Sequence, residues 1–140
     1  MKFSFLTESI AQSSGLAFVR IIVGLLLLYH GWEVFEGAKM DEYATWDVFK
    51  KSSYPLLMVY LGKGSELLAG GLLTIGLLTR IACLIIIGTM LYIAFFIGHG
   101  QIWYEDQHPF LFVLLALIFF FIGPGRWSID AVLWGHSGKK

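Results

Sequence analysis

Long apolar stretches dominate the pattern of hydrophobic and polar positions along the chain. Four of them can be delimited, at about residues 15–35, 55–79, 81–98 and 109–122. A bilayer core of roughly 30 Å requires about 20 residues of helix, which the first two stretches supply; the third is slightly shorter and the fourth is the shortest. Because lipid offers the backbone no hydrogen bonds, each stretch predicts a membrane-spanning helix, and the lack of apolar–polar alternation excludes barrel strands.

Short polar segments connect and flank these stretches. Residues 36–54 form the longest connection, and their aromatic side chains predict a short helix at the membrane interface. After the fourth stretch a Gly-Pro-Gly turn stops the helix, and Ser128 can cap a final short helix over residues 128–134, with Asp130 in its first turn. Residues 1–14 are mixed in polarity and predict an amphipathic lead rather than a removable signal. The pattern thus predicts a single all-α domain, an integral membrane four-helix bundle with a short C-terminal interfacial helix.

Composition supports this prediction and removes several function classes. Hydrophobic residues make up 57% of the 140 positions and charged residues only 14%, whereas soluble domains contain about 45–50% and 25%. Ten basic residues balance ten acidic ones, so bulk charge gives no reason to expect nucleic-acid binding. The single cysteine, Cys83, excludes an intrachain disulfide, a CxxC pair and a thiolate metal cluster.

The distribution of basic residues predicts the topology. With the N-terminus in the cytoplasm, the cytoplasmic ends of the helices carry Lys2, Arg80, Arg126, Lys139 and Lys140. The lysines on the opposite side are offset by neighbouring acidic residues. The positive-inside rule therefore predicts that both termini are cytoplasmic.

A few charged or titratable residues fall within or beside the apolar stretches, where each needs an explanation. His30 and Glu33 are three positions apart and share a helix face. Counting about 1.5 Å per residue from the cytoplasmic ends places Glu66 level with His30, and His99 lies on the same outward side. We therefore expect Glu66 and His30 to meet in the outer half of the bundle, with Glu33 or His99 nearby, around a pocket open to the extracytoplasmic side.

Several kinds of chemistry fit such a cluster. Imidazole and carboxylate groups could bind a metal, although no HxxxH or HExxH spacing is present. They could relay protons, or hydrogen-bond the carbonyls of a quinone whose ring stacks on Trp32, Tyr92 or Trp103. The structural alternative is a satisfied pair of Glu66 with His30 or with Lys63.

Three arginines carry further expectations. Arg20 lies inside the first stretch, where it is either a snorkelling structural residue or a binding group for an anion or a carboxylate partner. Arg80 and Arg126 share the cytoplasmic rim with Asp130, so we expect an ion pair between one of these arginines and Asp130. Such a clasp would tie the C-terminal helix to the bundle.

Glycines concentrate on the second stretch and predict that it is the central packing element. Small residues let membrane helices approach closely. The glycines expected on the contact face are Gly62, Gly64, Gly70, Gly71 and Gly76.

An ordered set of short motifs resembles the DoxX family of small bacterial inner-membrane proteins. The motifs are Arg20-Ile-Ile-Val-Gly24, His30-Gly31, Glu66-x-x-x-Gly70-Gly71, Gly76-Leu-Leu-Thr-Arg80 and Gly123-Pro-Gly-Arg-Trp-Ser-Ile-Asp130. The resemblance covers about residues 15–134 and implies a four-helix bundle of the kind shared with the membrane subunit of thiosulfate:quinone oxidoreductase. Family members often carry a lysine shortly after the His-Gly pair, where this chain has Glu33 and Val34.

The resemblance also implies a function. It favours a multi-pass inner-membrane protein that acts as an accessory or quinone-interacting subunit of a redox system. The depth and chemistry of Glu66 and His30 make them the candidate reactive groups. Quinone is the candidate cofactor that the resemblance implies, and the sequence has no metal, haem or flavin signature. The candidate partners are the lipid bilayer, a redox-enzyme subunit and a second copy of the chain. The alternative is a non-catalytic membrane scaffold or chaperone; a proton-coupled carrier is disfavoured because no inverted repeat is present.

Overall fold

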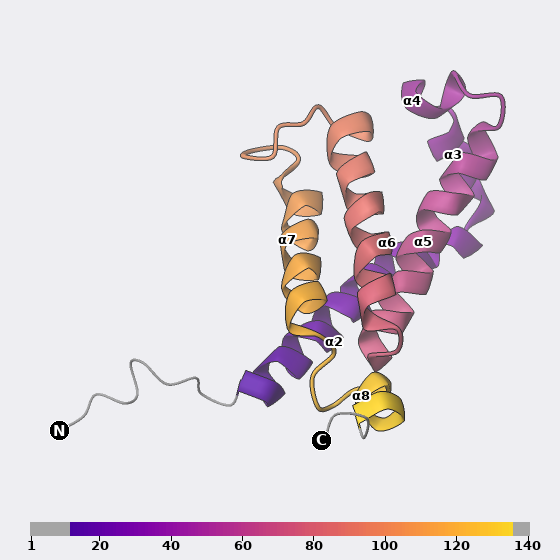
Figure 1. Ribbon diagram of the computed structural model, residues 1–140. Coiled ribbons are helices and arrows are strands. Elements are labelled where there is room, and N and C mark those ends of the chain that lie inside the picture. Colours follow the sequence, from indigo (N-terminus) through magenta and orange to yellow (C-terminus); the bar gives the residue numbers. More distant parts are fainter. Residues whose placement is uncertain (1–11, 136–140) are drawn as a thin grey trace.

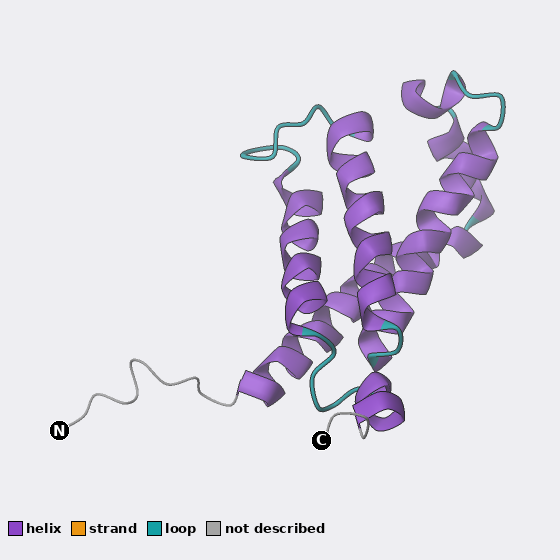
Figure 2. Ribbon diagram, viewed as in Figure 1, coloured by secondary structure: helices purple, strands orange, loops and turns teal. Residues whose placement is uncertain are grey.

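The computed structural model describes residues 12–135, and within this range every regular element is helical (Figure 2). The predicted lead at the N-terminus lies largely outside the described residues. The elements are α2 (Gln12–Gly31), the 3₁₀ turn η1 (Trp32–Phe35), α3 (Gly37–Ala44), α4 (Asp47–Lys50), α5 (Pro55–Ile75), α6 (Thr79–Tyr92), the π-helical turn η2 (Ile93–Ile97), α7 (Gln107–Ile122) and α8 (Ile129–Trp134).

Three helical segments are long and apolar enough to cross a membrane. They are Gln12–Phe35, Pro55–Ile75 and Thr79–Ile97, and they correspond to the first three predicted stretches. The fourth stretch is helix α7, whose 16 residues rise about 24 Å. This length is less than the roughly 30 Å of a bilayer core. The all-helical fold is thus confirmed, and the fourth span stays a prediction.

Helix α5 is the central packing element, as the sequence predicted. It contacts α2 most extensively, and also α6, η1, α3 and α4. Helix α7 packs mainly against α6 (Figure 1). The start of α2 and helix α8 lie at one end of the molecule, whereas α3 and α4 lie at the other. The buried core runs through all four long helices and includes Leu27, Leu73, Ile86 and Phe119.

Close approach of α2 to α5 depends on glycines, including Gly24, where a Cβ atom would lie 2.6 Å from the Thr74 backbone nitrogen. A Cβ atom on Gly31 would collide with the backbone of Leu67. A Cβ atom on Gly70 would lie 2.6 Å from the backbone nitrogen of Leu28. None of the three positions leaves room for a methyl group, so the crossing of the two helices requires glycine at all three.

The other α5 glycines correct the prediction of a continuous glycine contact face. Gly62 and Gly64 have no neighbour within 4 Å of a built Cβ, and Gly71 has only one, at 4.0 Å. Gly76 serves the turn instead: its φ of 68° ends α5 at Ile75, four positions before the predicted end. Helix α6 then begins at Thr79.

The segment between α2 and α5 forms two short helices, α3 and α4, where one interfacial helix was predicted. At the other end of the chain, the predicted cap of α8 is confirmed. The Ser128 hydroxyl accepts a hydrogen bond from the Ala131 amide at 3.1 Å and donates one to the Gly125 carbonyl at 2.7 Å. The connection between α2 and α5 is therefore helical as predicted but is divided into two helices, and α8 has the predicted cap.

Candidate functional site

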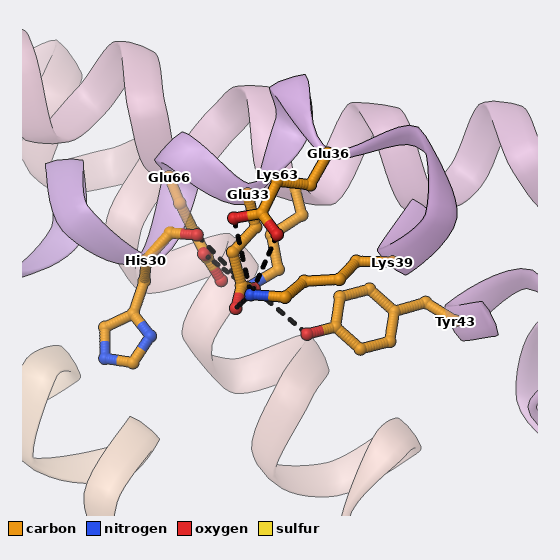
Figure 3. A network of polar contacts seen from close by, with 7 residues as sticks. All are labelled: His30, Glu33, Glu36, Lys39, Tyr43, Lys63 and Glu66. Atoms are coloured by element: carbon orange, nitrogen blue, oxygen red, sulfur yellow. Dashed lines mark hydrogen bonds and ion pairs between the residues drawn. The ribbon is translucent and has the colours of Figure 1, made fainter. Parts of the chain in front are cut away.

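Lys63 lies at the centre of an ionic network between α2 and α5 (Figure 3). Its Nζ atom donates to Glu66 Oε2 at 3.1 Å and to the backbone carbonyl of His30 at 3.4 Å. The same atom is 3.0 Å from Glu33 Oε2. Two carboxylates and one carbonyl therefore surround a single ammonium group.

The network continues from Glu33 into α3. Lys39 Nζ is 3.2 Å from Glu33 Oε1 and 3.2 Å from Glu36 Oε2, and the Tyr43 hydroxyl donates to Glu33 Oε2 at 3.0 Å. The hydrogen bonds to Glu33 and Glu36 raise the pKa of Lys39. Burial, followed by the bond to Glu33, raises the pKa of the Tyr43 hydroxyl.

Local structure explains why these groups meet. Lys63 and Glu66 are three positions apart on α5, a spacing that places two helical side chains next to each other. Gly31 brings the end of α2 against the Leu67 backbone. The 3₁₀ turn that follows therefore presents Glu33 to Lys63, and α3 then returns along α5 with Tyr43 facing the same carboxylate.

A cavity of about 470 Å³ adjoins the network between α3, α4, α5, α6 and η2. Its wall is largely apolar and aromatic, with Lys63 and Glu66 on one side. Among the described residues Glu66 Oε2 is bonded to Lys63, while Oε1 accepts no hydrogen bond. The residues that line the cavity include Tyr43, Trp46, Lys63, Glu66, Thr89 and Tyr92. The cavity thus combines an apolar volume with a charged edge.

Three of the predicted site residues lie at this cavity or its network. Glu66 and Tyr92 line the cavity, and Glu33 binds Lys63 beside it. The Tyr92 ring stacks on the Phe96 ring, with 5.1 Å between centroids. The structure therefore brings part of the predicted site together, and Lys63 is at its centre. The sequence analysis considered Lys63 only as a structural partner of Glu66.

The expected contact between the His30 and Glu66 side chains is not present. His30 contributes its backbone carbonyl to Lys63, while its ring turns away from Glu66 in Figure 3. The ring instead approaches that of His108, with 5.9 Å between centroids. The ammonium of Lys63 supplies the partner that Glu66 needs, so no imidazole is required there.

His99 and Trp32 lie away from the cavity. His99 is exposed and its backbone amide donates to Asp106 Oδ2 at 2.9 Å. The Trp32 ring packs edge-on against Phe35 and is more than half exposed. Neither side chain lines the cavity, so their expected part in the pocket is corrected.

Arg20 is also far from the cavity, at the end of the molecule that carries α8. Its side chain is buried, with 1% of the residue exposed. The guanidinium donates to the backbone carbonyls of Pro124 and Trp127. This placement favours the structural interpretation of Arg20 over the binding one, because both terminal nitrogens are held by the chain itself.

The clasp predicted between Asp130 and Arg80 or Arg126 is wrong, because Asp130 binds backbone amides instead. Asp130 forms no ion pair with Arg80 or Arg126. Its carboxylate accepts the backbone amides of Leu78 at 2.8 Å and Thr79 at 2.9 Å. The first amides of a helix have no partner within the helix and carry partial positive charge, so they attract the carboxylate better than exposed arginines do.

Sequence reasoning missed three members of the network, Glu36, Lys39 and Tyr43, and considered Lys63 only as a structural partner. The spacing of Lys63 and Glu66 was a usable signal for their pairing. Lys39 and Tyr43 lie in the segment that connects α2 to α5. The spacing of hydrophobic residues does not predict that this segment returns along α5. Within residues 12–135 no group of three or more His, Cys, Asp and Glu side chains could hold a metal ion.

Comparison with protein families gives one match. The DoxX family model matches residues 15–100, a range that includes most of α2, all of α5 and α6, and the whole ionic network. Comparisons with curated proteins and with solved structures find no significant match.

Proposed function

Because the chain belongs to the DoxX family of membrane proteins, we propose that it binds a quinone in the cavity beside Lys63 and Glu66 as a subunit of a membrane-associated redox system. In this proposal the redox centre belongs to a partner protein. The chain supplies the binding site and the groups that exchange protons with the quinone. The cavity at the edge of the ionic network carries the proposal.

The size and wall of the cavity suit a ring compound with a lipid-like tail. Its volume of about 470 Å³ falls within the roughly 300–1,000 Å³ typical of small-molecule sites. Tyr92 and Trp46 offer aromatic faces, and Trp46 and Leu61 at the wall are themselves exposed. A ligand can therefore enter from the surface of the protein.

The polar edge of the cavity matches both oxidation states of a quinone. A quinol hydroxyl can donate to the free Oε1 atom of Glu66. The hydroxyl of Thr89, on the α6 wall, can donate to a quinone carbonyl. Two polar groups, one on the α5 wall and one on the α6 wall of an apolar volume, would fix the ring orientation, as in other small-molecule sites.

The same proposal includes the arrangement in the membrane. We place α7 as a fourth span and both chain ends on the cytoplasmic side of a bacterial inner membrane. The start of α2 and helix α8 lie at the same end of the molecule, which agrees with this topology (Figure 1). The network then lies in the outer half of the bundle.

The test is direct binding of a short-chain ubiquinone analogue, and of a menaquinone analogue, to the full chain in lipid nanodiscs. Quenching of tryptophan fluorescence reports occupancy, since Trp46 lines the cavity. Gly88→Leu places a side chain into the same cavity, and we expect it to weaken binding by about tenfold or more, or ~1.4 kcal/mol. Gly64→Leu is the matched control, because this helix glycine lies outside the cavity.

Two outcomes would contradict quinone binding. One is that neither analogue quenches the fluorescence of the parent protein. The other is that Gly88→Leu and Gly64→Leu bind like the parent. Either result, combined with loss of a partner protein when the chain is deleted, would support the scaffold alternative instead.

A further inference from the structure

The five charged side chains of the network form a graded series from the cavity outward (Figure 3). The exposed fraction of the side chain rises from 5% at Glu66 to 19% at Lys63 and 23% at Glu33. It then reaches 42% at Lys39 and 51% at Glu36. Each member is within 3.2 Å of the next, so no step in the series requires a gap to be crossed.

The series also runs from the middle of one candidate span to beyond the end of another. Glu66 lies eleven residues beyond Pro55, the start of α5, which corresponds to a depth of about 16 Å. Half the thickness of a bilayer core is about 15 Å. Glu36 and Lys39 lie beyond Phe35, where the first candidate span ends. By this count the inner end of the series lies near the middle of the candidate span Pro55–Ile75, and the outer end lies beyond the candidate spans.

We propose that Glu66, Lys63, Glu33, Lys39 and Glu36 form a proton path between the cavity and the aqueous surface. The proposal deepens the proposed function, because the proton enters or leaves at the cavity where the quinone would bind. Glu66 Oε1 is the inner terminal, since it faces no protein donor among the described residues. Glu36 is the outer terminal.

Each transfer moves one proton along a contact already formed. Outward, Glu66 accepts a proton from a hydroxyl group or water in the cavity. Lys63 passes one of its protons to Glu33 and takes the proton of Glu66 in its place. Glu33 and Lys39 repeat this exchange, and Glu36 releases the proton to water. All five side chains end in their starting states, so no oxidant or reductant is required.

The other titratable side chains that the structure describes near the series do not provide a second route for the proton. His30 contacts Lys63 only through its backbone, and its ring faces His108. From α3, the Tyr43 hydroxyl donates to Glu33 Oε2 and holds that carboxylate as an acceptor. From α6, Tyr92 lines the cavity but has no hydrogen bond to the described members of the series.

The experiment follows the protonation of Glu66 in time. The full chain in lipid nanodiscs is subjected to a pH jump without quinone, and the carboxyl bands are recorded by time-resolved infrared spectroscopy. Glu66→Gln assigns the band by removing it. We expect Glu33→Gln to slow the protonation of Glu66 by about tenfold or more, which is a barrier increase of ~1.4 kcal/mol. The matched control, Glu42→Gln, alters an exposed carboxylate of α3 that forms no ion pair within residues 12–135.

A second variant keeps the test decisive if Glu33→Gln does not fold. Glu33→Asp retains the charge that neutralises Lys63 and withdraws the carboxylate by one methylene, which breaks the 3.0 Å contact. It should also slow the protonation of Glu66, and a rate equal to that of the parent would overturn the path. Because the measurement contains no quinone, a protein that binds quinone without this slowing refutes the path alone. A protein that shows the slowing without binding refutes only the quinone proposal.

Discussion

The two ends of the molecule both hold buried charge, and they neutralise it differently. At the α8 end, the Arg20 guanidinium bonds to backbone carbonyls and the Asp130 carboxylate to backbone amides. At the α3 end, Lys63 bonds to the carboxylates of Glu33 and Glu66. We refer to Arg20 and Asp130 with their backbone partners as the clasp. The network remains the ionic cluster around Lys63 and Glu33, which includes Glu66, Lys39, Glu36 and Tyr43.

The difference separates a structural device from one suited to chemistry. Backbone carbonyls and amides do not titrate, so the clasp has one state and holds α8 and the Gly-Pro-Gly turn in place. Every charged partner in the network can gain or lose a proton, and a cavity adjoins it. Buried titratable clusters beside a cavity are where proton chemistry is commonly found.

The largest expected effect is at the clasp. Arg20→Met removes the donors of two carbonyls at a buried site. An unsatisfied buried polar group costs about 1–3 kcal/mol, so the loss should be about 3 kcal/mol or more. Equilibrium unfolding in detergent micelles measures it, with the exposed Arg126→Met as control. If both variants unfold like the parent, the clasp does not hold the fold together.

The second effect concerns the helix crossing that connects the two ends. Gly70→Ala places a methyl group 2.6 Å from the Leu28 nitrogen, and overpacking of this kind costs about 1–3 kcal/mol. Gly71→Ala is the matched control, since its nearest neighbour is at 4.0 Å. Thermal unfolding of the two variants should differ clearly. Equal stabilities would mean that α2 and α5 can separate at no cost.

The sequence predicted the crossing and the long helices, because both follow from apolar length and small residues. It could not distinguish Gly70 from Gly71, since the two differ only in which face of α5 they occupy relative to α2. The same limit explains the site. Depth along a helix placed Glu66 and His30 at one level, yet rotation about the helix axis decides which side chains meet. Lys39 and Tyr43 depend on the path of a connection, which periodicity does not encode.

The third effect tests the partners of Asp130. Asp130→Asn removes the charge that faces the first amides of α6 and leaves one acceptor oxygen for the Leu78 and Thr79 amides. Losing such a cap costs about 1–2 kcal/mol. Arg80→Gln should change the unfolding free energy by less than about 0.5 kcal/mol, as surface substitutions usually do. An equal loss of unfolding free energy in both variants would instead support the predicted ion pair between Arg80 and Asp130.

The smallest effect returns to the network, where a pH dependence distinguishes it from the clasp. Tyr43→Phe removes the hydroxyl that donates to Glu33, and at this partly exposed position the loss should be about 1 kcal/mol. Folding raises the pKa of Tyr43 above its ordinary value of 10.0, through burial and then the bond to Glu33. A raised pKa means that the folded state favours the protonated hydroxyl. Its contribution is therefore complete below about pH 10 and is lost as the pH rises through the folded-state pKa.

The unfolding free energies of the parent and Tyr43→Phe should thus differ by a constant amount from neutral pH to about pH 9 and converge above pH 10. Tyr104→Phe is the control, because this tyrosine is 80% exposed and should show no such difference. The Arg20→Met loss should stay constant over the same range, since neither the guanidinium nor its carbonyl partners titrate there. A Tyr43→Phe difference that does not change with pH would show that the network, like the clasp, is held in a single protonation state.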